Sequence, residues 1–251
     1  MENILEVKNI ELIYYTLQNQ TQALKDISFN LANGEFVSIV GPSGCGKTTI
    51  LSLVAGLLKA TNGTITIHSN SENPCGYMFQ KDLLFDWRNI EENLALGLEI
   101  QKKRTQENML YVTNLAQKYG LGDFLKHYPN QLSGGMRQRA SLIRTLALKP
   151  EILLLDEPFS ALDFQTRLNV CDDVYKILKE EKKSAILVTH DISEAISMSD
   201  RIFVLSERPA IIKKVVRLDF NSNLTPFERR KEPNFSKYFD LIWSELENET
   251  K

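Results

Sequence analysis

One glycine-rich segment constrains the fold of this chain more than any other feature. Residues 41–48 read GPSGCGKT, which fits the pattern GxxxxGK[ST]. An apolar run, 36–40, precedes the segment, and apolar residues at helical spacing follow it through residues 47–58. In the order strand, loop and helix, such a segment lets successive backbone N–H groups and the start of the helix face a phosphate. We therefore predict an α/β fold with a nucleotide site at this loop.

The residue types in this loop suit phosphate chemistry. Glycines let the backbone curl around an anion, Lys47 reaches the β- and γ-phosphates, and the Thr48 hydroxyl can ligate Mg²⁺. An ordinary glycine turn before a helix is the alternative interpretation, which the flanking strand and helix disfavour. The residues expected to bind ATP are those of the loop and of the first helical turn: Gly41, Pro42, Ser43, Gly44, Cys45, Gly46, Lys47, Thr48 and Thr49.

A second candidate element is the run ILLLDE at residues 152–157. Its four apolar residues predict a buried strand, and two carboxylates follow at the end of that strand. In open α/β sheets, ligands bind at the carboxyl ends of the strands. Asp156 is suited to the Mg²⁺ shell, and Glu157 can polarise the attacking water as a general base. Acidic residues often cap buried strands, so this run gains its meaning from the P-loop that precedes it in the chain.

The pattern along the chain predicts a core interrupted by helices. Residues 4–40 alternate short apolar runs with polar turns, which indicates an N-terminal antiparallel β region. Further strands are expected at 152–156, 184–189 and 201–205, and helical segments between them favour a parallel core sheet. The expected units are a first part of the core, an inserted helical subdomain, a second part of the core and a helical tail: 1–88, 89–149, 150–208 and 209–251.

Composition narrows the classes of protein that fit. The formal net charge is −2 over 251 residues, with both signs interspersed, so no nucleic-acid partner is expected. No apolar run reaches the roughly 18 residues of a membrane span, and the N-terminal residues do not form a secretory signal. Cys45, Cys75 and Cys171 form no CxxC pair, which favours a reducing compartment without a zinc site. We expect a cytosolic chain that reaches a membrane only through partners.

The segment 132–139, LSGGMRQR, resembles the LSGGQ signature of ABC ATPases, with Met136 in place of the commonest Gln. A serine and two glycines that open a helix make a second anion-binding geometry in a chain that needs only one P-loop. A capped helix start without a ligand is the alternative for this motif alone. The resemblance implies a head-to-tail homodimer in which Ser133, Gly134 and Gly135 touch the γ-phosphate held by the other subunit.

The remaining positions of the ABC family follow in order. By resemblance, Tyr14 stacks on adenine, with Tyr15 as a near rival, and Gln80 senses Mg²⁺ and the attacking water. The sequence SALD at 160–163 matches the D-loop, whose Asp163 is placed at the nucleotide. His190 matches the switch histidine that contacts the γ-phosphate. The catalytic set implied is Lys47, Gln80, Glu157 and His190, and the Mg²⁺ set is Thr48, Gln80 and Asp156.

Two further segments resemble the nitrate, sulfonate and taurine importer ATPases. Residues 79–88, FQKDLLFDWR, are similar to the "LLPWR" region of that group, and residues 204–209, VLSERP, to its "VLSxRP" ending. Asp86 and Phe164 depart from the usual residues. The resemblance implies an ATP-hydrolysing importer subunit at the cytoplasmic face of the cell membrane. Its partners would be two membrane-spanning permease subunits and, indirectly, an extracytoplasmic solute-binding protein.

Three alternatives share the nucleotide site. An ATPase of an exporter or lipoprotein-release system would have the same nucleotide site, and only the regions of Trp87 and of Arg208-Pro209 argue against it. Relatives with this signature are also associated with thiamine-precursor pyrimidine importers. A soluble ABC protein that remodels ribosomes or DNA would usually carry two ATPase domains or a long coiled coil, and this sequence shows neither.

Large apolar residues crowd the segment that follows Gln80. Leu83 and Leu84 are expected to pack beneath the helical subdomain. Trp87 lies between two charges, which indicates an exposed anchor for the membrane subunits. In the tail, Phe235, Phe239, Ile242, Trp243 and Leu246 recur at helical spacing, so we expect a final amphipathic helix that packs on its own domain.

Overall fold

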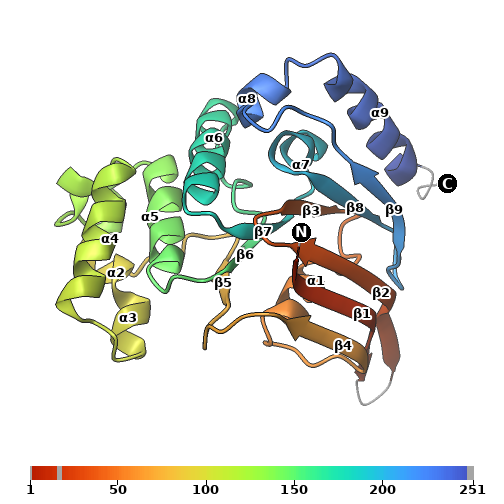
Figure 1. Ribbon diagram of the computed structural model, residues 1–251, viewed down its shortest axis with the longest axis horizontal. Coiled ribbons are helices and arrows are strands. Elements are labelled where there is room, and N and C mark those ends of the chain that lie inside the picture. The colour runs from red at the N-terminus through yellow and green to blue at the C-terminus, as the bar shows by residue number, and fades with distance from the viewer. Residues whose placement is uncertain (1, 16–18, 248–251) are drawn as a thin grey trace.

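A computed structural model describes residues 2–15 and 19–247 and shows two sheets with helices around them (Figure 1). The smaller sheet is antiparallel, in the order β2-β1-β4. Its strands are β1 (Asn3–Tyr15), β2 (Gln20–Ala32) and β4 (Asn62–Ile67). Alternate residues of β1 and β2 are buried, as expected for strands with one face on the core. The predicted N-terminal antiparallel region is confirmed.

The larger sheet has six strands in the order β5-β6-β7-β3-β8-β9. All neighbouring pairs are parallel except β8 and β9, which run antiparallel. The strands are β3 (Phe36–Val40), β5 (Cys75–Met78), β6 (Ile152–Asp156), β7 (Ser184–Val188), β8 (Arg201–Leu205) and β9 (Ile212–Arg217). Strands β3, β6 and β7 are buried throughout, because helices or the smaller sheet cover both of their faces.

Helices lie in several of the connections between these strands, and two more follow the last strand. They are α1 (Lys47–Val54), α2 (Ile90–Leu94), α3 (Leu96–Ile100), α4 (Gln106–Lys118), α5 (Gly134–Leu146), α6 (Phe164–Glu180), α7 (Ile192–Met198), α8 (Pro226–Arg229) and α9 (Asn234–Glu247). Two short 3₁₀ turns, Gly122–Phe124 and Pro129–Gln131, lie between α4 and α5. Helices α2 to α5 gather at one end of the molecule, beyond β5 (Figure 1). The α/β fold with inserted helices is therefore confirmed.

The core has three apolar clusters. One joins α1 to the smaller sheet and to one face of the larger sheet, through residues such as Leu51, Ile27 and Ile39. A second joins the other face to α5, α6 and the inserted helices. The third packs α7 and α9 over β8, with Ile242 of α9 fully buried. The final amphipathic helix and its packing on its own domain are confirmed.

Two expectations about element boundaries are wrong. The helix after the P-loop ends at Val54 rather than near residue 58, and Leu57 and Leu58 are exposed. Residues 209–251 are not purely helical, because β9 forms the sheet edge before α8 begins. This strand contains two lysines and an arginine and has one buried residue, Val216, so its pattern gives a weak strand signal. Only its pairing with β8 identifies it.

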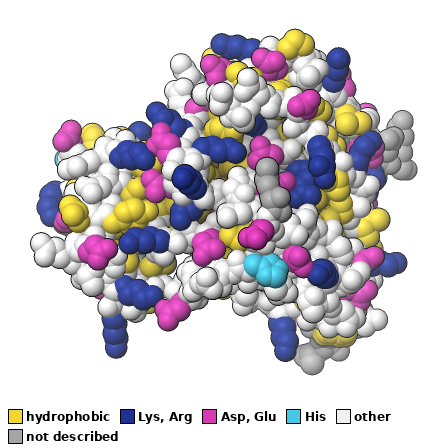
Figure 2. Space-filling model, viewed as in Figure 1, with side chains coloured by type: hydrophobic (Ala, Val, Ile, Leu, Met, Phe, Trp, Pro, Cys, Tyr) yellow, Lys and Arg dark blue, Asp and Glu magenta, His cyan; other side chains and the backbone are white. Residues whose placement is uncertain are grey.

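Within residues 2–15 and 19–247, none of the helices combines the length and apolar character needed to cross a bilayer. Lys and Arg side chains lie among Asp and Glu over the face shown in Figure 2. The visible surface therefore presents no extended region of one sign, in keeping with the net charge of the sequence.

Candidate functional site

The phosphate-binding loop joins β3 to α1. Gly44 and Gly46 adopt φ values of +75° and +123°, which side chains other than glycine rarely tolerate. A Cβ on Gly46 would lie 2.9 Å from Cδ2 of Leu24, so this glycine also lets the loop approach β2. No side chain of the described residues caps α1, whose first-turn N–H groups can therefore serve an anionic ligand. The cradle fits a chain of phosphates.

Lys47 is held by the loop itself. Its side chain is buried, with 7% of the residue exposed, and Nζ donates to the carbonyls of Gly41 at 2.8 Å and Pro42 at 2.9 Å. A buried ammonium group needs such partners, and these two fix its direction along the inside of the loop. The lysine is thus positioned in advance for a phosphate in the cradle.

Asp156 ends β6 beside the first turn of α1. Its carboxylate accepts hydrogen bonds from the Thr48 hydroxyl at 2.9 Å and the Tyr77 hydroxyl at 3.0 Å. Burial raises the pKa of Asp156, while these two hydrogen bonds lower it in part. Burial also raises the pKa of Tyr77, so the phenol stays a donor. The Thr48 hydroxyl and the Asp156 carboxylate are hard oxygen donors, which are the ligand types that fit Mg²⁺.

Glu157 is the centre of a second polar cluster. Its φ of +46° lies in the left-handed region, which is costly for a residue with a side chain. The backbone hydrogen bond from Glu157 N to Val188 O, 2.8 Å, supports this conformation. Its Oε2 lies 3.1 Å from Nδ1 of His190 and accepts a bond of 3.4 Å from Nε2 of Gln80. Side chains from two other segments therefore meet at the Glu157 carboxylate.

The order of strands explains this meeting. Strands β5, β6 and β7 are adjacent and parallel, so the residues that follow them emerge together at the carboxyl ends of the strands. Gln80 follows β5, Glu157 follows β6 and His190 follows β7. The three sequence-predicted positions are thus brought together, as the family resemblance implied, and Ser160 joins them through a 3.2 Å bond from Gln80.

A cavity of about 470 Å³ lies beside the P-loop. It is lined by Ser43, Gly44, Gly46, Lys47, Thr48, Thr49, Glu157, His190 and Arg208. The cavity brings cationic groups and the Glu157 carboxylate to the place where the loop would hold phosphates. This arrangement can bind a triphosphate and polarise a water molecule next to its outer end.

The signature residues lie elsewhere in the chain. Ser133 caps α5, and its hydroxyl accepts from Met136 N at 3.3 Å. A Cβ on Gly134 would lie 3.1 Å from Cδ2 of Leu162, and one on Gly135 would lie 3.0 Å from Cγ2 of Val170. The glycines therefore allow α5 to pack closely against the start of α6. Among the described residues that line the P-loop cavity, none belongs to the signature.

Asp163 and the two tyrosines also lie outside that lining. The Asp163 carboxylate caps α6 by accepting from Thr166 N at 3.0 Å. Hydrogen bonding to the Thr166 side chain, and then to its backbone N–H, lowers the pKa of Asp163. Tyr14 and Tyr15, at the end of β1, are both exposed. Both tyrosines therefore stay candidates for the adenine-stacking aromatic.

Sequence patterns missed three residues of the site. Tyr77 bonds to Asp156, Ser160 to Gln80, and Arg208 lines the cavity. Tyr77 carried no signal because β5 itself was not recognised as a strand next to β6. Ser160 was quoted within the D-loop, and Arg208 within VLSERP, but neither motif indicated a contact at the site.

A groove of about 350 Å³ separates the inserted helices from β5. Its apolar lining includes Phe79, Leu83, Phe85 and Ile100. Leu84 is buried as expected, whereas the expectation for Leu83 is wrong, since 47% of Leu83 is exposed and its φ is +48°. The left-handed backbone turns Leu83 outward to line the groove. Trp87 is 74% exposed and stacks on Phe85, with ring centroids 4.7 Å apart.

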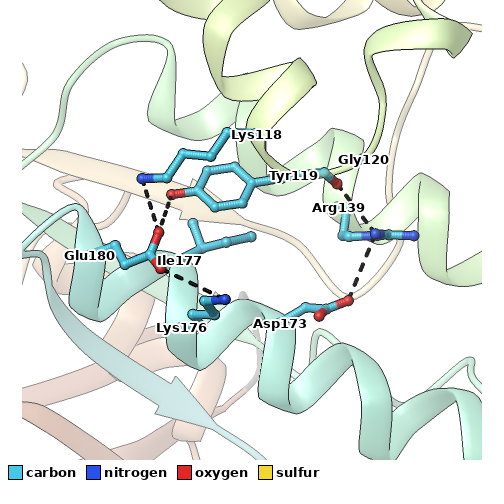
Figure 3. Close-up of a pocket in the computed structure, with 8 residues that line it drawn as sticks. All are labelled: Lys118, Tyr119, Gly120, Arg139, Asp173, Lys176, Ile177 and Glu180. Carbon is cyan, nitrogen blue, oxygen red and sulfur yellow. Dashed lines mark hydrogen bonds and ion pairs between the residues drawn. The ribbon is translucent and has the colours of Figure 1, made fainter.

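Another polar cavity, of about 380 Å³, lies between α4, α5 and α6 (Figure 3). Its charged side chains face one another across the space, with Lys118 2.9 Å from Glu180 and Arg139 3.8 Å from Asp173. These ion pairs engage the charged groups that a ligand would need. The P-loop cavity is therefore the better candidate site.

Comparisons with known proteins identify the family of this chain. The family model described as "ABC transporter" matches residues 24–160, more than half of the chain. An uncharacterized ABC transporter ATP-binding protein, YtlC of Bacillus subtilis, is 47% identical over 97% of this chain and 96% of its own length. The taurine import ATP-binding protein TauB of Jannaschia is 38% identical, covering 95% and 94%. The nitrate import ATP-binding protein NrtD of Synechocystis is 36% identical, covering 96% and 94%.

Solved structures of ABC transporter cassettes are also similar to this chain. The dimeric structure of MJ0796, a bacterial ABC transporter cassette, matches with a TM-score of 0.71 at 32% identity and covers 86% of this chain and 100% of that one. The same cassette in a dimeric post-hydrolysis state bound to ADP and Pi matches with a TM-score of 0.69 at 31% identity, with the same coverage. The chain therefore belongs to the ABC transporter family and is one of its ATP-binding, ATP-hydrolysing subunits.

Proposed function

We propose that this ATPase drives the uptake of a small solute of the nitrate, sulfonate or taurine type through separate membrane subunits. One observation supports ATP hydrolysis at this site: the P-loop and four polar side chains converge at the carboxyl ends of the parallel strands. These side chains are Gln80, Asp156, Glu157 and His190. Relatives named as taurine and nitrate import proteins, aligned over nearly the whole chain, support the direction and class of transport.

The residues of the site have distinct proposed roles. Lys47 and the loop N–H groups bind the phosphates, while Thr48, Asp156 and Gln80 would hold Mg²⁺. Bound Mg²⁺ would neutralise charge on the β- and γ-phosphates. Glu157 accepts a proton as the water oxygen attacks the γ-phosphorus, the bond to the β–γ bridging oxygen breaks, and ADP and phosphate leave. His190 orients the Glu157 carboxylate and contacts the γ-phosphate.

A head-to-tail homodimer completes each site. Ser133, Gly134, Gly135 and Asp163 do not line the cavity of their own chain, and Ser133 lies exposed at the start of α5. A helix start of this kind suits an anion presented from outside. We therefore assign these four residues to the nucleotide held by the partner subunit. The dimeric structures of a similar cassette support this pairing.

The apolar groove beside β5 is the proposed contact with the membrane subunits. Trp87, stacked on Phe85 and exposed, is an aromatic anchor of the kind that dominates interfaces. Arg88 is held at the rim by a 2.7 Å ion pair with Glu99. Two permease subunits docked here would keep the ATPase peripheral, at the cytoplasmic face, and an extracytoplasmic binding protein would act on it only through them.

Reconstitution tests the proposal. The chain would be assembled in proteoliposomes with the membrane subunits that co-purify with it, and with their binding protein. We expect binding protein loaded with taurine, a sulfonate or nitrate to stimulate ATP hydrolysis and inward transport. Stimulation by thiamine-precursor pyrimidines alone would contradict the solute class, and outward movement of substrate would contradict import. The Glu157→Gln protein is the control, because it should bind ATP without transport.

A further inference from the structure

The turn after β8 reaches the P-loop because of the strand order. Strand β8 is the parallel neighbour of β3, with Val204 opposite Val40. A Cβ on Gly41 would lie 3.0 Å from Cβ of Leu205, so the segments that follow β3 and β8 are in contact where they leave the sheet. Residues 206–209 therefore emerge beside the first half of the phosphate-binding loop.

The turn is fixed in that place by hydrogen bonds. Ala210 N donates to Ala23 O at 3.0 Å, and Lys25 N donates to Ala210 O at 2.9 Å. The Ser206 hydroxyl closes the turn by accepting from Ile211 N at 3.0 Å. Ala23 and Lys25 belong to β2, and this strand also packs through Leu24 against Gly46 of the P-loop. The turn and the loop thus share a common support, so their spacing is set by the fold.

Arg208 projects from this turn into the nucleotide cavity. It lines the cavity, and its Nη2 lies 3.9 Å from the position that a Cβ on Gly44 would take. Arg208 is exposed to solvent. In the part of the chain that the structure describes, its guanidinium makes no hydrogen bond or ion pair. Arg201, by contrast, bonds to Glu35 at 2.8 Å and to Asn30. Arg208 therefore brings an uncompensated charge to an anion-binding site.

We propose that Arg208 binds the outer phosphates of the ATP held by its own P-loop, and so favours ATP over ADP. The inference rests on the proposed function. Arg208 lines the same cavity as Lys47 and His190, the residues assigned to the outer phosphates, so its guanidinium faces the space that these phosphates would fill. A planar guanidinium can bind two phosphate oxygens with a fixed pair of parallel N–H donors, a geometry that the compact ammonium group of a lysine does not impose.

Calorimetry on the purified full chain tests this contact. Arg208→Ala should weaken ATP binding about 5- to 30-fold, ADP binding by less than about 3-fold, and leave AMP binding unchanged. Arg208→Lys should recover part of the ATP affinity, because it keeps the charge without the fork. Arg217→Ala is the matched control, since Arg217 is exposed at the far end of the adjoining strand β9 and should change nothing.

The outcomes separate this inference from the proposed function. If Lys47→Ala loses ATP binding while Arg208→Ala and Arg208→Lys both bind ATP like the wild type, the Arg208 contact is wrong and the P-loop stands. An equal loss for ATP, ADP and AMP would also overturn it, because it would place the arginine at the adenosine or in the fold. Unchanged ATP binding in Lys47→Ala would instead contradict the nucleotide site itself.

Discussion

Nδ1 of His190 lies 3.1 Å from Oε2 of Glu157, although 33 residues separate them in the chain. The pair exists because β6 and β7 are neighbours, with Asp156 opposite Val188 in the parallel ladder. The left-handed backbone at Glu157 aims its side chain at the cavity where the P-loop would present a γ-phosphate. The predictions below test this geometry and the surfaces around it.

Glu157→Gln should bind ATP normally but lower the rate of hydrolysis by roughly 10²- to 10⁴-fold, because an amide cannot accept the proton. Phosphate release measures the rate, and gel filtration with ATP should show an accumulated dimer. Glu107→Gln, an exposed change on α4, is the control and should leave both unaltered. A Glu157→Gln protein that stays monomeric at every ATP concentration would contradict the closed dimer.

Lys47→Ala should weaken ATP binding by at least about 10-fold, because a buried, oriented charge leaves the phosphates. Calorimetry measures the affinity. Lys59→Ala, at an exposed position beyond α1, should bind ATP like the wild type. Equal affinities for the Lys47→Ala and wild-type proteins would show that the loop does not hold the phosphates.

Ser133→Arg should leave nucleotide binding by the monomer intact while blocking turnover, since Ser133 is assigned to the opposite subunit. Mixing it with Lys47→Ala places both lesions in one of the two composite sites of a mixed dimer and leaves the other complete. We expect partial recovery of ATPase activity in such mixtures. No recovery in verified mixed dimers would favour action within one chain.

Trp87→Ala should reduce co-purification with the membrane subunits, at a cost on the order of 2 kcal/mol if Trp87 is an anchor. The isolated chain should still bind ATP and dimerise, because Trp87 is exposed and is not one of the residues that line the P-loop cavity. Trp243→Ala removes the chain's other tryptophan, also exposed, on α9, and serves as the control. Normal assembly and transport by Trp87→Ala would refute the docking surface.

Asp156→Asn should stabilise the nucleotide-free chain at neutral pH while abolishing activity. Burial raises the folded-state pKa of Asp156, so its contribution to stability is full below the unfolded pKa near 4 and is lost as pH rises through the raised pKa. The neutral amide removes that loss, and each 1 kcal/mol gained raises Tm by roughly 2–4 °C. Thermal melts at pH 7 and pH 4 should show the gain only at pH 7. A lower Tm for Asp156→Asn at pH 7 would show that the hydrogen bonds from Thr48 and Tyr77 outweigh burial.

Local patterns were enough for the elements that carry their own signal. The P-loop, the buried strand before Asp156 and the signature helix each combine a hydrophobic period with residue types that only a few backbone shapes accept, so the sequence predicted them correctly. The family resemblance then linked Gln80, Glu157 and His190. In the structure, Gln80 and His190 each lie within hydrogen-bonding distance of the Glu157 carboxylate. The end of α1 and the edge strand β9 had no such signal.

The sequence by itself therefore determined the nucleotide loop, the α/β class and the family, because these depend on residues close together in the chain. Tertiary structure alone decided which neighbours complete the site. Tyr77 reaches Asp156 because β5 pairs with β6, and Arg208 reaches the P-loop because β8 pairs with β3. Pairing between strands far apart in the chain depends on how whole layers pack, and no local period encodes it.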